Sequence, residues 1–122
     1  MASDRRIKAE RSGRWAETAA LWLLRLKGYR LLARRYKSPF GEVDLIMRRG
    51  DVTAFVEVKA RATLDAAVES VTRFQSRRIT GAARSWMGRD PLAARQTCRF
   101  DIVAVSPYHW PHHIENAFDG DD

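Results

Sequence analysis

Apolar and polar residues follow two different periods along the chain, and these periods predict a mixed α/β protein. Residues 12–27 carry apolar side chains at the spacing of a helix, with Ser12 as a candidate N-cap and Gly28 as a stop signal. A second helical pattern covers residues 72–87. The residues expected to face the core are Trp15, Ala16, Ala19, Trp22, Leu23 and Leu26 in the first helix and Ile79, Ala82, Ala83 and Trp86 in the second.

Segments rich in β-branched, leucine and aromatic residues predict strands between and after these helices. Two of them alternate apolar and polar side chains on either side of a glycine turn, which predicts a β-hairpin. Residues 60–71 fit either a loop or a short helix. The predicted strands are residues 29–36, 42–48, 52–59, 100–105 and 112–115. The order α-β-β-β-α-β implies an α/β (α+β) protein with a mixed sheet flanked by helices.

Acidic residues gather on the predicted hairpin. A two-residue turn at 49–50 places Asp44 opposite Phe55, and the same register places Glu42 opposite Glu57. Asp44 and Glu57 are then diagonal neighbours on one face of the sheet, with Cβ atoms about 7 Å apart or less. The hairpin therefore predicts two carboxylates that reach toward one point.

Two converging carboxylates are suited to a hard divalent cation such as Mg²⁺ or Mn²⁺. Such an ion polarises a phosphoryl oxygen and lowers the pKa of a bound water. Lys59 lies on the same face as Glu57, where it could orient or deprotonate that water or stabilise charge on a phosphate. The combination suggests phosphodiester hydrolysis, whereas a solvated hairpin face with an ordinary Glu–Lys pair is the simpler alternative.

The charge distribution narrows the class of partner. Lys and Arg total 22 against 15 Asp and Glu, a formal net charge of +7. By segment, the net charge is +8 over residues 1–40, −1 over 41–60, +5 over 61–99 and −5 over 100–122. Positive charge thus flanks the short segment in which acids dominate, a pattern typical of nucleic-acid partners. A solvated basic surface would give the same balance.

The length of 122 residues fits one domain. We expect this domain to cover residues 12–118, with a flexible basic segment at 1–11 and an acidic tail at 119–122. The longest apolar run, residues 19–24, falls far below the roughly 18 residues that a membrane span requires. A single cysteine, Cys98, excludes an internal disulfide and fits a reducing, cytoplasmic compartment.

Both halves of the hairpin resemble the PD-(D/E)xK nuclease core and, more closely, the YraN-like family of uncharacterised bacterial proteins. The hairpin motifs that carry the resemblance are Gly41-Glu42-Val43-Asp44-Leu45-Ile46 and Phe55-Val56-Glu57-Val58-Lys59-Ala60-Arg61. Residues 13–17, 70–79, 99–103 and 116–118 match as well, so the resemblance spans residues 12–118. It implies a restriction-endonuclease-like fold, similar to that of the archaeal Holliday junction resolvases.

The resemblance also implies roles for individual residues. Asp44 and Glu57 would be metal ligands, with the backbone carbonyl of Val58 as a third, and Lys59 would be the catalytic lysine. Glu17 matches a helix-borne acid of the resolvase-like enzymes and would join the metal and catalytic residues. An ordinary surface glutamate is the alternative for Glu17.

Several polar residues around these positions are candidates for contact with nucleic acid. Glu42 is a candidate supporting residue. Gln75 stands where the family usually has a lysine, so it can bind a phosphate or a water but supplies no charge. The stripe of Arg73, Arg77 and Arg84 is either a solvated face or a DNA contact. The candidate nucleic-acid-binding residues are Arg61, Arg73, Gln75, Arg77, Arg78 and Arg84.

Three functions compete at this point. The first is a Mg²⁺- or Mn²⁺-dependent endonuclease acting on DNA rather than RNA, with branched or structured DNA among the substrates and a homodimer expected by analogy with the resolvases. The second is a nucleic-acid-binding module that keeps the fold without catalysis. The third is an assembly factor that docks through the acidic residues 115–122. Asp101, inside an apolar strand, is expected to be structural and to pair with Arg99 or Arg61.

Overall fold

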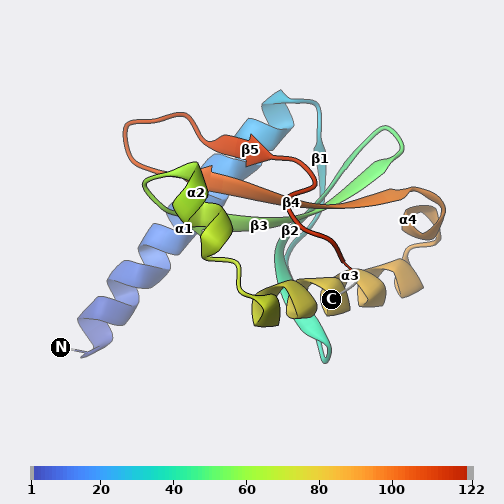
Figure 1. The fold of residues 1–122 in the computed structure, drawn as a ribbon, viewed down its shortest axis with the longest axis horizontal. Helices are drawn as coiled ribbons and strands as arrows, with labels where there is room; N and C mark the ends of the chain where they lie inside the picture. Colours follow the sequence, from blue (N-terminus) through green and yellow to red (C-terminus); the bar gives the residue numbers. More distant parts are fainter. Residues whose placement is uncertain (1, 121–122) are drawn as a thin grey trace.

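The computed structural model describes the backbone of residues 2–120 and the side chains of residues 13–120. Its elements, in chain order, are α1 (Ala2–Leu26), β1 (Arg30–Ser38), β2 (Gly41–Arg49), β3 (Val52–Ala60), α2 (Leu64–Glu69), α3 (Arg73–Arg89), α4 (Pro91–Arg95), β4 (Thr97–Val105) and β5 (His112–Ile114) (Figure 1). The predicted class and element order are confirmed. The segment 60–71 contains the short helix α2, and α4 is an additional helix that the sequence pattern did not predict.

The five strands form one sheet in the order β1-β2-β3-β4-β5. Every neighbouring pair is antiparallel except β3 and β4, which run parallel. Parallel neighbours require a long crossover connection, and α2, α3 and α4 provide it. Because β3 has a hydrogen-bonded neighbour on each side, it is an inner strand of the sheet.

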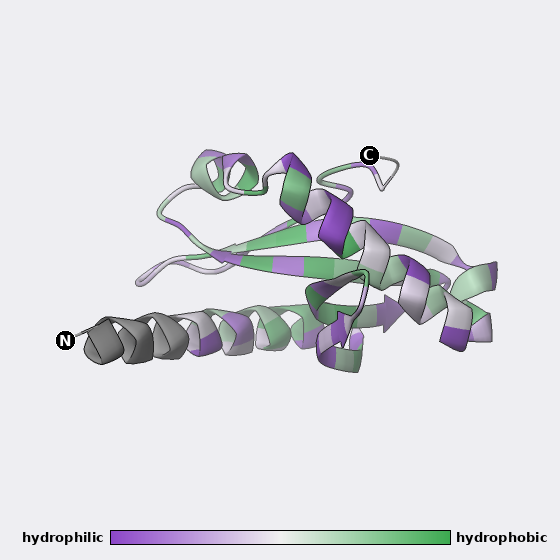
Figure 2. Cartoon of the chain, turned by 90° about the horizontal axis from the view of Figure 1, so that it is seen from below, coloured by the Kyte–Doolittle hydropathy of each residue, from purple (hydrophilic) through white to green (hydrophobic). Residues whose placement is uncertain are grey.

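Helices cover both faces of the sheet. Helix α1 runs along one face, as Figure 2 shows, and packs on Leu45, Val56 and Val103. Helix α3 covers the other face, where Ile79, Ala82 and Ala83 pack on apolar residues that include Phe55. The predicted inward face of the second helix is therefore confirmed. Among residues 2–120, no helix is long and apolar enough to cross a bilayer.

The first helix differs from the prediction in its start and in its buried stripe. It begins at Ala2, so Ser12 lies within the helix and is not its N-cap. Trp15, Trp22 and Leu26 were expected in the core but are 51%, 58% and 74% exposed. The apolar arc of the helix is wider than the stripe that the sheet covers, so one edge stays in solvent. The buried stripe consists of Ala16, Glu17, Ala20, Leu21 and Leu24.

Two expected terminal segments lie wholly or partly outside the described residues. The side chains of residues 1–12 are not described, so the flexible basic segment at 1–11 stays a prediction. The acidic tail at 119–122 is described only as far as Gly120.

The hairpin between β2 and β3 forms as predicted, but its register was wrong by two residues. Ile46 pairs with Phe55 and Arg49 pairs with Val52, so the turn residues are Gly50 and Asp51. Gly50 adopts a left-handed φ of 59°, which costs glycine little because it has no Cβ. A shift of two residues keeps every side chain on its expected face.

Close backbone contact fixes α3 against the turn between β1 and β2. A Cβ atom at Gly81 would lie 2.3 Å from the carbonyl oxygen of Phe40, and one at Gly41 would lie 1.8 Å from that of Arg78. Gly81 weakens the helix by about 1 kcal/mol relative to alanine, but only glycine allows this approach. The helix begins at a capping box in which Thr72 accepts from the Gln75 backbone and Gln75 reaches back to Thr72. These contacts place the first turns of α3 beside the polar ends of β2 and β3.

Candidate functional site

The candidate site lies where β2 and β3 separate. Paired residues of the hairpin extend only as far as Leu45 and Val56, whereas β3 continues to pair with β4 through Ala60. Beyond the end of the hairpin pairing, Oδ2 of Asp44 accepts a hydrogen bond of 2.8 Å from the backbone N–H of Val58. A carboxylate thus occupies the position of the missing ladder acceptor and is held in the fork between the strands.

Glu57 lies against this carboxylate. Its side chain is 12% exposed and hydrogen-bonds to Asp44. Burial, followed by the hydrogen bond to Asp44 and the negative charge of Asp44, raises the pKa of Glu57 from 4.5 to about 9. Glu57 therefore keeps its proton at neutral pH. Asp44 and Glu57 thus lie close enough to interact, whereas their role as metal ligands stays a prediction.

Lys59 is held on the α3 side of the same group. Its Nζ lies 3.6 Å from Oε2 of Glu57 and donates a hydrogen bond of 3.2 Å to Oε1 of Gln75. The same Gln75 oxygen accepts from the backbone N–H of Thr72 at 3.4 Å. Gln75 therefore joins the first turn of α3 to the lysine, and Lys59 is only 12% exposed. The sequence did not predict this positioning contact.

Glu17 is buried at 6% exposure, but two arginines hold it. Its carboxylate accepts from Nε of Arg34 at 2.5 Å and from Nε of Arg35 at 3.1 Å. Glu17 and Asp44 line one cavity of about 370 Å³, together with Arg14 and Arg35. The acid on the first helix thus faces the site, although its charge is compensated by arginines.

The two arginines around Glu17 are residues that sequence reasoning missed. Successive side chains of a regular strand point to opposite faces, so Arg34 and Arg35 would not both reach one carboxylate. Arg35 has a left-handed φ of 52°, and the β1–β2 register shifts between Leu31 and Ala33. This irregularity lets neighbouring arginines approach Glu17. No glycine or asparagine marks the position, so the sequence carried no signal for it.

Carboxylates of the site suit a hard cation only in part. Asp44 and Glu57 are crowded oxygen donors, and a divalent cation would relieve the repulsion between two ionised carboxylates. Among the side chains of residues 13–120, no three His, Cys, Asp or Glu residues gather closely enough to enclose a metal ion. Asp44 and Glu57 supply the oxygen donors that such a cation prefers, and the ligand roles of Asp44, Glu57, Glu17 and the Val58 carbonyl stay predictions.

On the α3 side, a cavity of about 430 Å³ opens onto Glu57 and Lys59, whereas Asp44 lines the cavity that contains Glu17. Glu57 and Lys59 lie in its wall, and the predicted residues Glu42, Arg61, Gln75 and Arg78 line it as well. Glu42 is exposed and contributes an outer wall, so its supporting role is not decided by this geometry. Arg61 and Arg78 place positive charge at the rim of an acidic centre.

The other predicted basic residues do not join this cavity. Arg73 and Arg77 are exposed on α3. Arg84 lines a separate cavity of about 320 Å³ with Cys98 and Phe118. The basic stripe is therefore an exposed surface beside the site and not part of its wall.

Asp101 is structural, as expected, and its partner is Arg99 rather than Arg61. Two hydrogen bonds of 2.8 Å join the Arg99 guanidinium to the Asp101 carboxylate. His113 Nε2 lies 2.7 Å from the same carboxylate, and the backbone N–H of Asn116 donates to it at 3.0 Å. This cluster joins β4 to the end of the chain.

Fold and site together define a mixed α+β protein with two half-buried carboxylates and a lysine at a strand fork, beside a basic rim. A family model described as "Uncharacterised protein family UPF0102" matches residues 16–105. The chain therefore belongs to the UPF0102 family, which confirms the YraN-like resemblance.

Similar proteins extend over almost the whole chain. A UPF0102 protein of Chelativorans sp. (strain BNC1) is 53% identical over 113 residues, which cover 93% of this chain and 91% of that protein. The UPF0102 protein mlr4633 of Mesorhizobium japonicum is 52% identical over 97% of this chain and 94% of its own length. A UPF0102 protein of Methylocella silvestris is 52% identical over 98% of this chain and 96% of its own length.

Proposed function

We propose that this protein is a metal-dependent endonuclease of the PD-(D/E)xK type that hydrolyses phosphodiester bonds in DNA. The supporting observation is the contact between Asp44 and Glu57, with Lys59 beside them at the fork of β2 and β3. A binding module would gain nothing from burying two carboxylates against each other, since the pair costs desolvation and repulsion. The same crowding is expected where a divalent cation belongs.

Asp44 and Glu57 would hold Mg²⁺ or Mn²⁺, with the Val58 carbonyl as the third predicted ligand. When bound, such an ion polarises a phosphoryl oxygen and lowers the pKa of a water that attacks phosphorus. Asp44 is fixed for this role because the Val58 N–H holds one of its oxygens. Glu57 would hold the ion in its ionised form, so its proton would pass to solvent on binding.

The remaining residues of the wall bind and orient the substrate. Gln75 holds Lys59 toward the carboxylates, so its amino group lies where charge on a phosphate would develop. Arg61 and Arg78 line the same cavity and would contact flanking phosphates. Phosphate contacts position a nucleic acid without reading its sequence, so we expect recognition of DNA structure instead of DNA sequence.

A second candidate is a nucleic-acid-binding module that keeps the fold without catalysis. The observation in its favour is the pairing of Glu17 with Arg34 and Arg35, which compensates the charge of an acid that was expected to bind the metal. Gln75 in place of the family's usual lysine points the same way.

The deciding experiment is cleavage of duplex, single-stranded, flap and four-way-junction DNA, with matching RNA, in Mg²⁺ or Mn²⁺. Wild type is compared with Asp44→Asn, Glu57→Gln and Lys59→Met. Asp65→Asn and Lys37→Ala, which change exposed residues outside the site, are the matched controls. We expect cutting that needs the metal, that the controls retain, and that each site variant lowers by about 100-fold or more.

Binding without cutting, unchanged in all three site variants, would contradict the proposal and favour the binding module. Circular dichroism of each variant checks that it is folded. Sedimentation of the wild type with and without a four-way junction tests the homodimer that two-strand cleavage would need.

A further inference from the structure

A cavity with aromatic walls lies at the ends of β3 and β4. Its volume is about 480 Å³, and it is lined by Trp15 of α1, by Ala60 and Arg61 after β3, and by Pro107 and Tyr108 after β4. Trp15 is 51% exposed and Tyr108 is fully exposed. We call it the aromatic cavity. Its aromatic lining faces solvent instead of a packed core.

The backbone of Tyr108 adds an independent sign of function. Its φ is 69°, in the left-handed region that a residue with a bulky side chain rarely adopts. A conformation of this kind costs about 1–3 kcal/mol and is typically found at ligand clamps and active sites. The loop therefore accepts strain to hold a tyrosine outward, next to the tryptophan of α1.

Arg61 connects the aromatic cavity to Glu57 and Lys59. It lines both the aromatic cavity and the cavity that contains Glu57 and Lys59. Its backbone N–H donates to the Val105 carbonyl at 3.1 Å, which keeps the ends of β3 and β4 side by side. Lys59 precedes Arg61 by two residues, roughly 7 Å along an extended chain.

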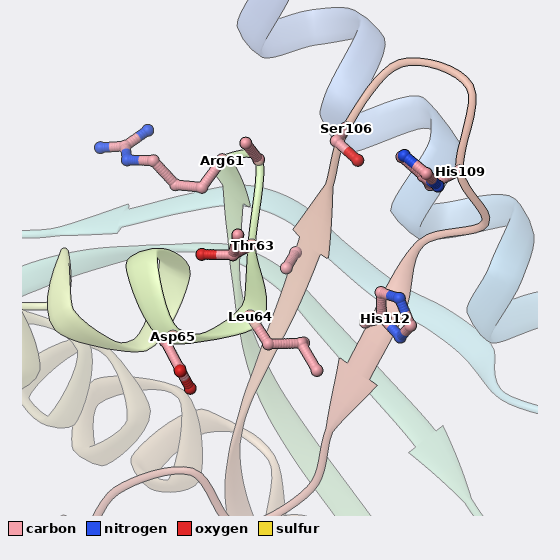
Figure 3. A pocket seen from close by; sticks show the side chains of 9 residues that line it. Arg61, Thr63, Leu64, Asp65, Ser106, His109 and His112 are labelled. Carbon is pink, nitrogen blue, oxygen red and sulfur yellow. The ribbon is translucent and has the colours of Figure 1, made fainter.

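Figure 3 shows this end of the sheet from a third cavity of about 420 Å³, with Arg61 and Ser106 at neighbouring strand ends. The loop from Ser106 to His109 passes in front of α1 in this view, in agreement with the lining of the aromatic cavity by Trp15. The guanidinium of Arg61 extends outward from this edge, where a polyanion can reach it.

We infer that the aromatic cavity binds an unpaired nucleobase of the strand whose phosphodiester lies at Asp44 and Glu57. Aromatic side chains stack on the π-face of any base, which gives about 1–3 kcal/mol per base. Arg61 at the rim, and Arg14 next to Trp15 on α1, carry the charge that the adjoining phosphates need. A base inside a duplex cannot enter such a cavity unless it leaves the stack.

The inference rests on the proposed function and names its substrate class: DNA with at least one unpaired nucleotide beside the cleaved bond. Single strands, flaps and unpaired nucleotides at junctions meet this condition, whereas a continuous duplex does not. An apolar segment of another protein would fit the aromatic walls, but it would leave the arginines of the rim unpartnered.

Binding measured in EDTA tests the cavity independently of cleavage. The probes are a fluorescein-labelled oligothymidylate, an abasic strand of equal length and the corresponding duplex, read by anisotropy. We expect Trp15→Ala and Tyr108→Leu each to weaken binding of the oligothymidylate by about 5-fold or more. We expect both variants to bind the abasic strand and the duplex with affinities within about 2-fold of the wild type, because charge alone carries that binding.

Two matched variants control for loss of aromatic surface and for folding. Trp22→Ala removes a similarly exposed tryptophan from the same helix, outside the aromatic cavity, and should leave all affinities unchanged. Tyr108→Phe keeps the ring and should bind like the wild type.

Equal affinity of Trp15→Ala, Tyr108→Leu and the wild type for the oligothymidylate would overturn the inference, even if the protein cuts DNA. A dimer that Trp15→Ala dissociates, with no change in oligothymidylate affinity, would overturn it in favour of a second copy of the chain. Loss of base-dependent binding in the two variants, in a protein that cuts no DNA, would support the cavity and reject the nuclease.

Discussion

Two acids on neighbouring strands of the sheet, Asp101 and the largely buried Glu57, have pKa values that are shifted in opposite directions. Asp101 on β4 is fully buried and receives hydrogen bonds from Arg99, the Asn116 backbone and His113. Burial alone would raise the pKa of Asp101, but the hydrogen bonds from His113 and Arg99 outweigh it and lower the pKa below 3.8. Glu57 on β3 pairs with Ile102, the residue that follows Asp101 on β4. The pKa of Glu57 is nevertheless raised to about 9.

The two pKa values differ because the two carboxyl groups have different hydrogen-bond donors around them. Asp101 meets a guanidinium, an imidazole and a backbone N–H, so its negative charge is compensated and it stabilises the fold. Glu57 meets another carboxylate, and its nearest cation, Lys59, is 3.6 Å away and also bonded to Gln75. A buried acid that lacks donors keeps its proton, and it is such groups that typically mark functional sites. The comparison therefore separates a structural acid from a candidate catalytic one within a single sheet.

Removal of Asp101 should have the largest effect on stability. Asp101→Ala leaves Arg99 largely buried without its partner, so we expect a loss of about 3–5 kcal/mol in the free energy of unfolding. Urea unfolding followed by circular dichroism measures it, with Asp119→Ala, an exposed acid, as the control. A loss of less than about 1 kcal/mol would contradict the structural role of Asp101, which distinguishes it from Glu57.

The pH dependence of stability should reveal Glu57. The folded-state pKa of about 9 lies above the ordinary 4.5, so the contribution of Glu57 is fully present below pH 4.5. It is lost as the pH rises toward 9, because the unfolded chain ionises first. We expect the wild type to lose about 5 kcal/mol relative to Glu57→Gln between pH 5 and pH 9 in EDTA.

Urea unfolding at a series of pH values measures this difference between wild type and Glu57→Gln. If the free energy of unfolding depended on pH in the same way in the two proteins, the raised pKa of Glu57 would be contradicted. Asp101 should act with the opposite sign, because its lowered pKa means that its stabilisation is lost only as the solution becomes strongly acidic.

Divalent cations should stabilise the protein through the carboxylate pair. A cation that binds only the folded state raises the unfolding free energy, and we expect about 1–3 kcal/mol at saturating Mn²⁺, reversed by EDTA. Asp44→Asn combined with Glu57→Gln should abolish the increase in Tm. Glu17→Gln should keep it, since Arg34 and Arg35 already neutralise Glu17. Loss of the increase in Glu17→Gln would establish Glu17 as a ligand instead.

The smallest expected effect concerns Gln75. Gln75→Lys removes the side chain that completes the capping box and places a second cation beside Lys59, so we expect a loss of about 0.5–1 kcal/mol. Gln75→Glu keeps a cap acceptor and is the matched control. Thermal unfolding compares the two, and a stabilised Gln75→Lys protein would show that the amide does not hold Lys59.

Sequence patterns predicted the faces of the hairpin but not its register. Alternation alone places Phe55, Glu57 and Lys59 on one side of β3, and this holds for any shift by two residues. The register depended on which two residues form the turn, and Arg49-Gly50-Asp51 allowed both choices. The structure has Gly50 and Asp51 in the turn, with Gly50 in the left-handed conformation. The resulting register places Asp44 beside Glu57.

Other features had weaker signals or none. The exposed position of Trp15 and Trp22 depends on how much of α1 the sheet covers, which no local pattern contains. The left-handed backbone at Arg35 could not be predicted, because no glycine or asparagine stands at that position. Helix α4 was missed although Asp90 and Pro91 form a recognisable start, an N-cap acid followed by proline in the first turn.

The most direct test of the account is the pKa of Glu57 itself, measured from the ¹³C shifts of the side-chain carboxyl groups across a pH titration in EDTA. Glu57→Gln identifies the resonance, and Asp101 is followed in the same spectra. The account predicts that Glu57 remains protonated at pH 7 and titrates near 9, while Asp101 stays ionised. A Glu57 carboxyl that titrates near its ordinary value of 4.5 would contradict the crowded carboxylate pair on which the proposed site depends.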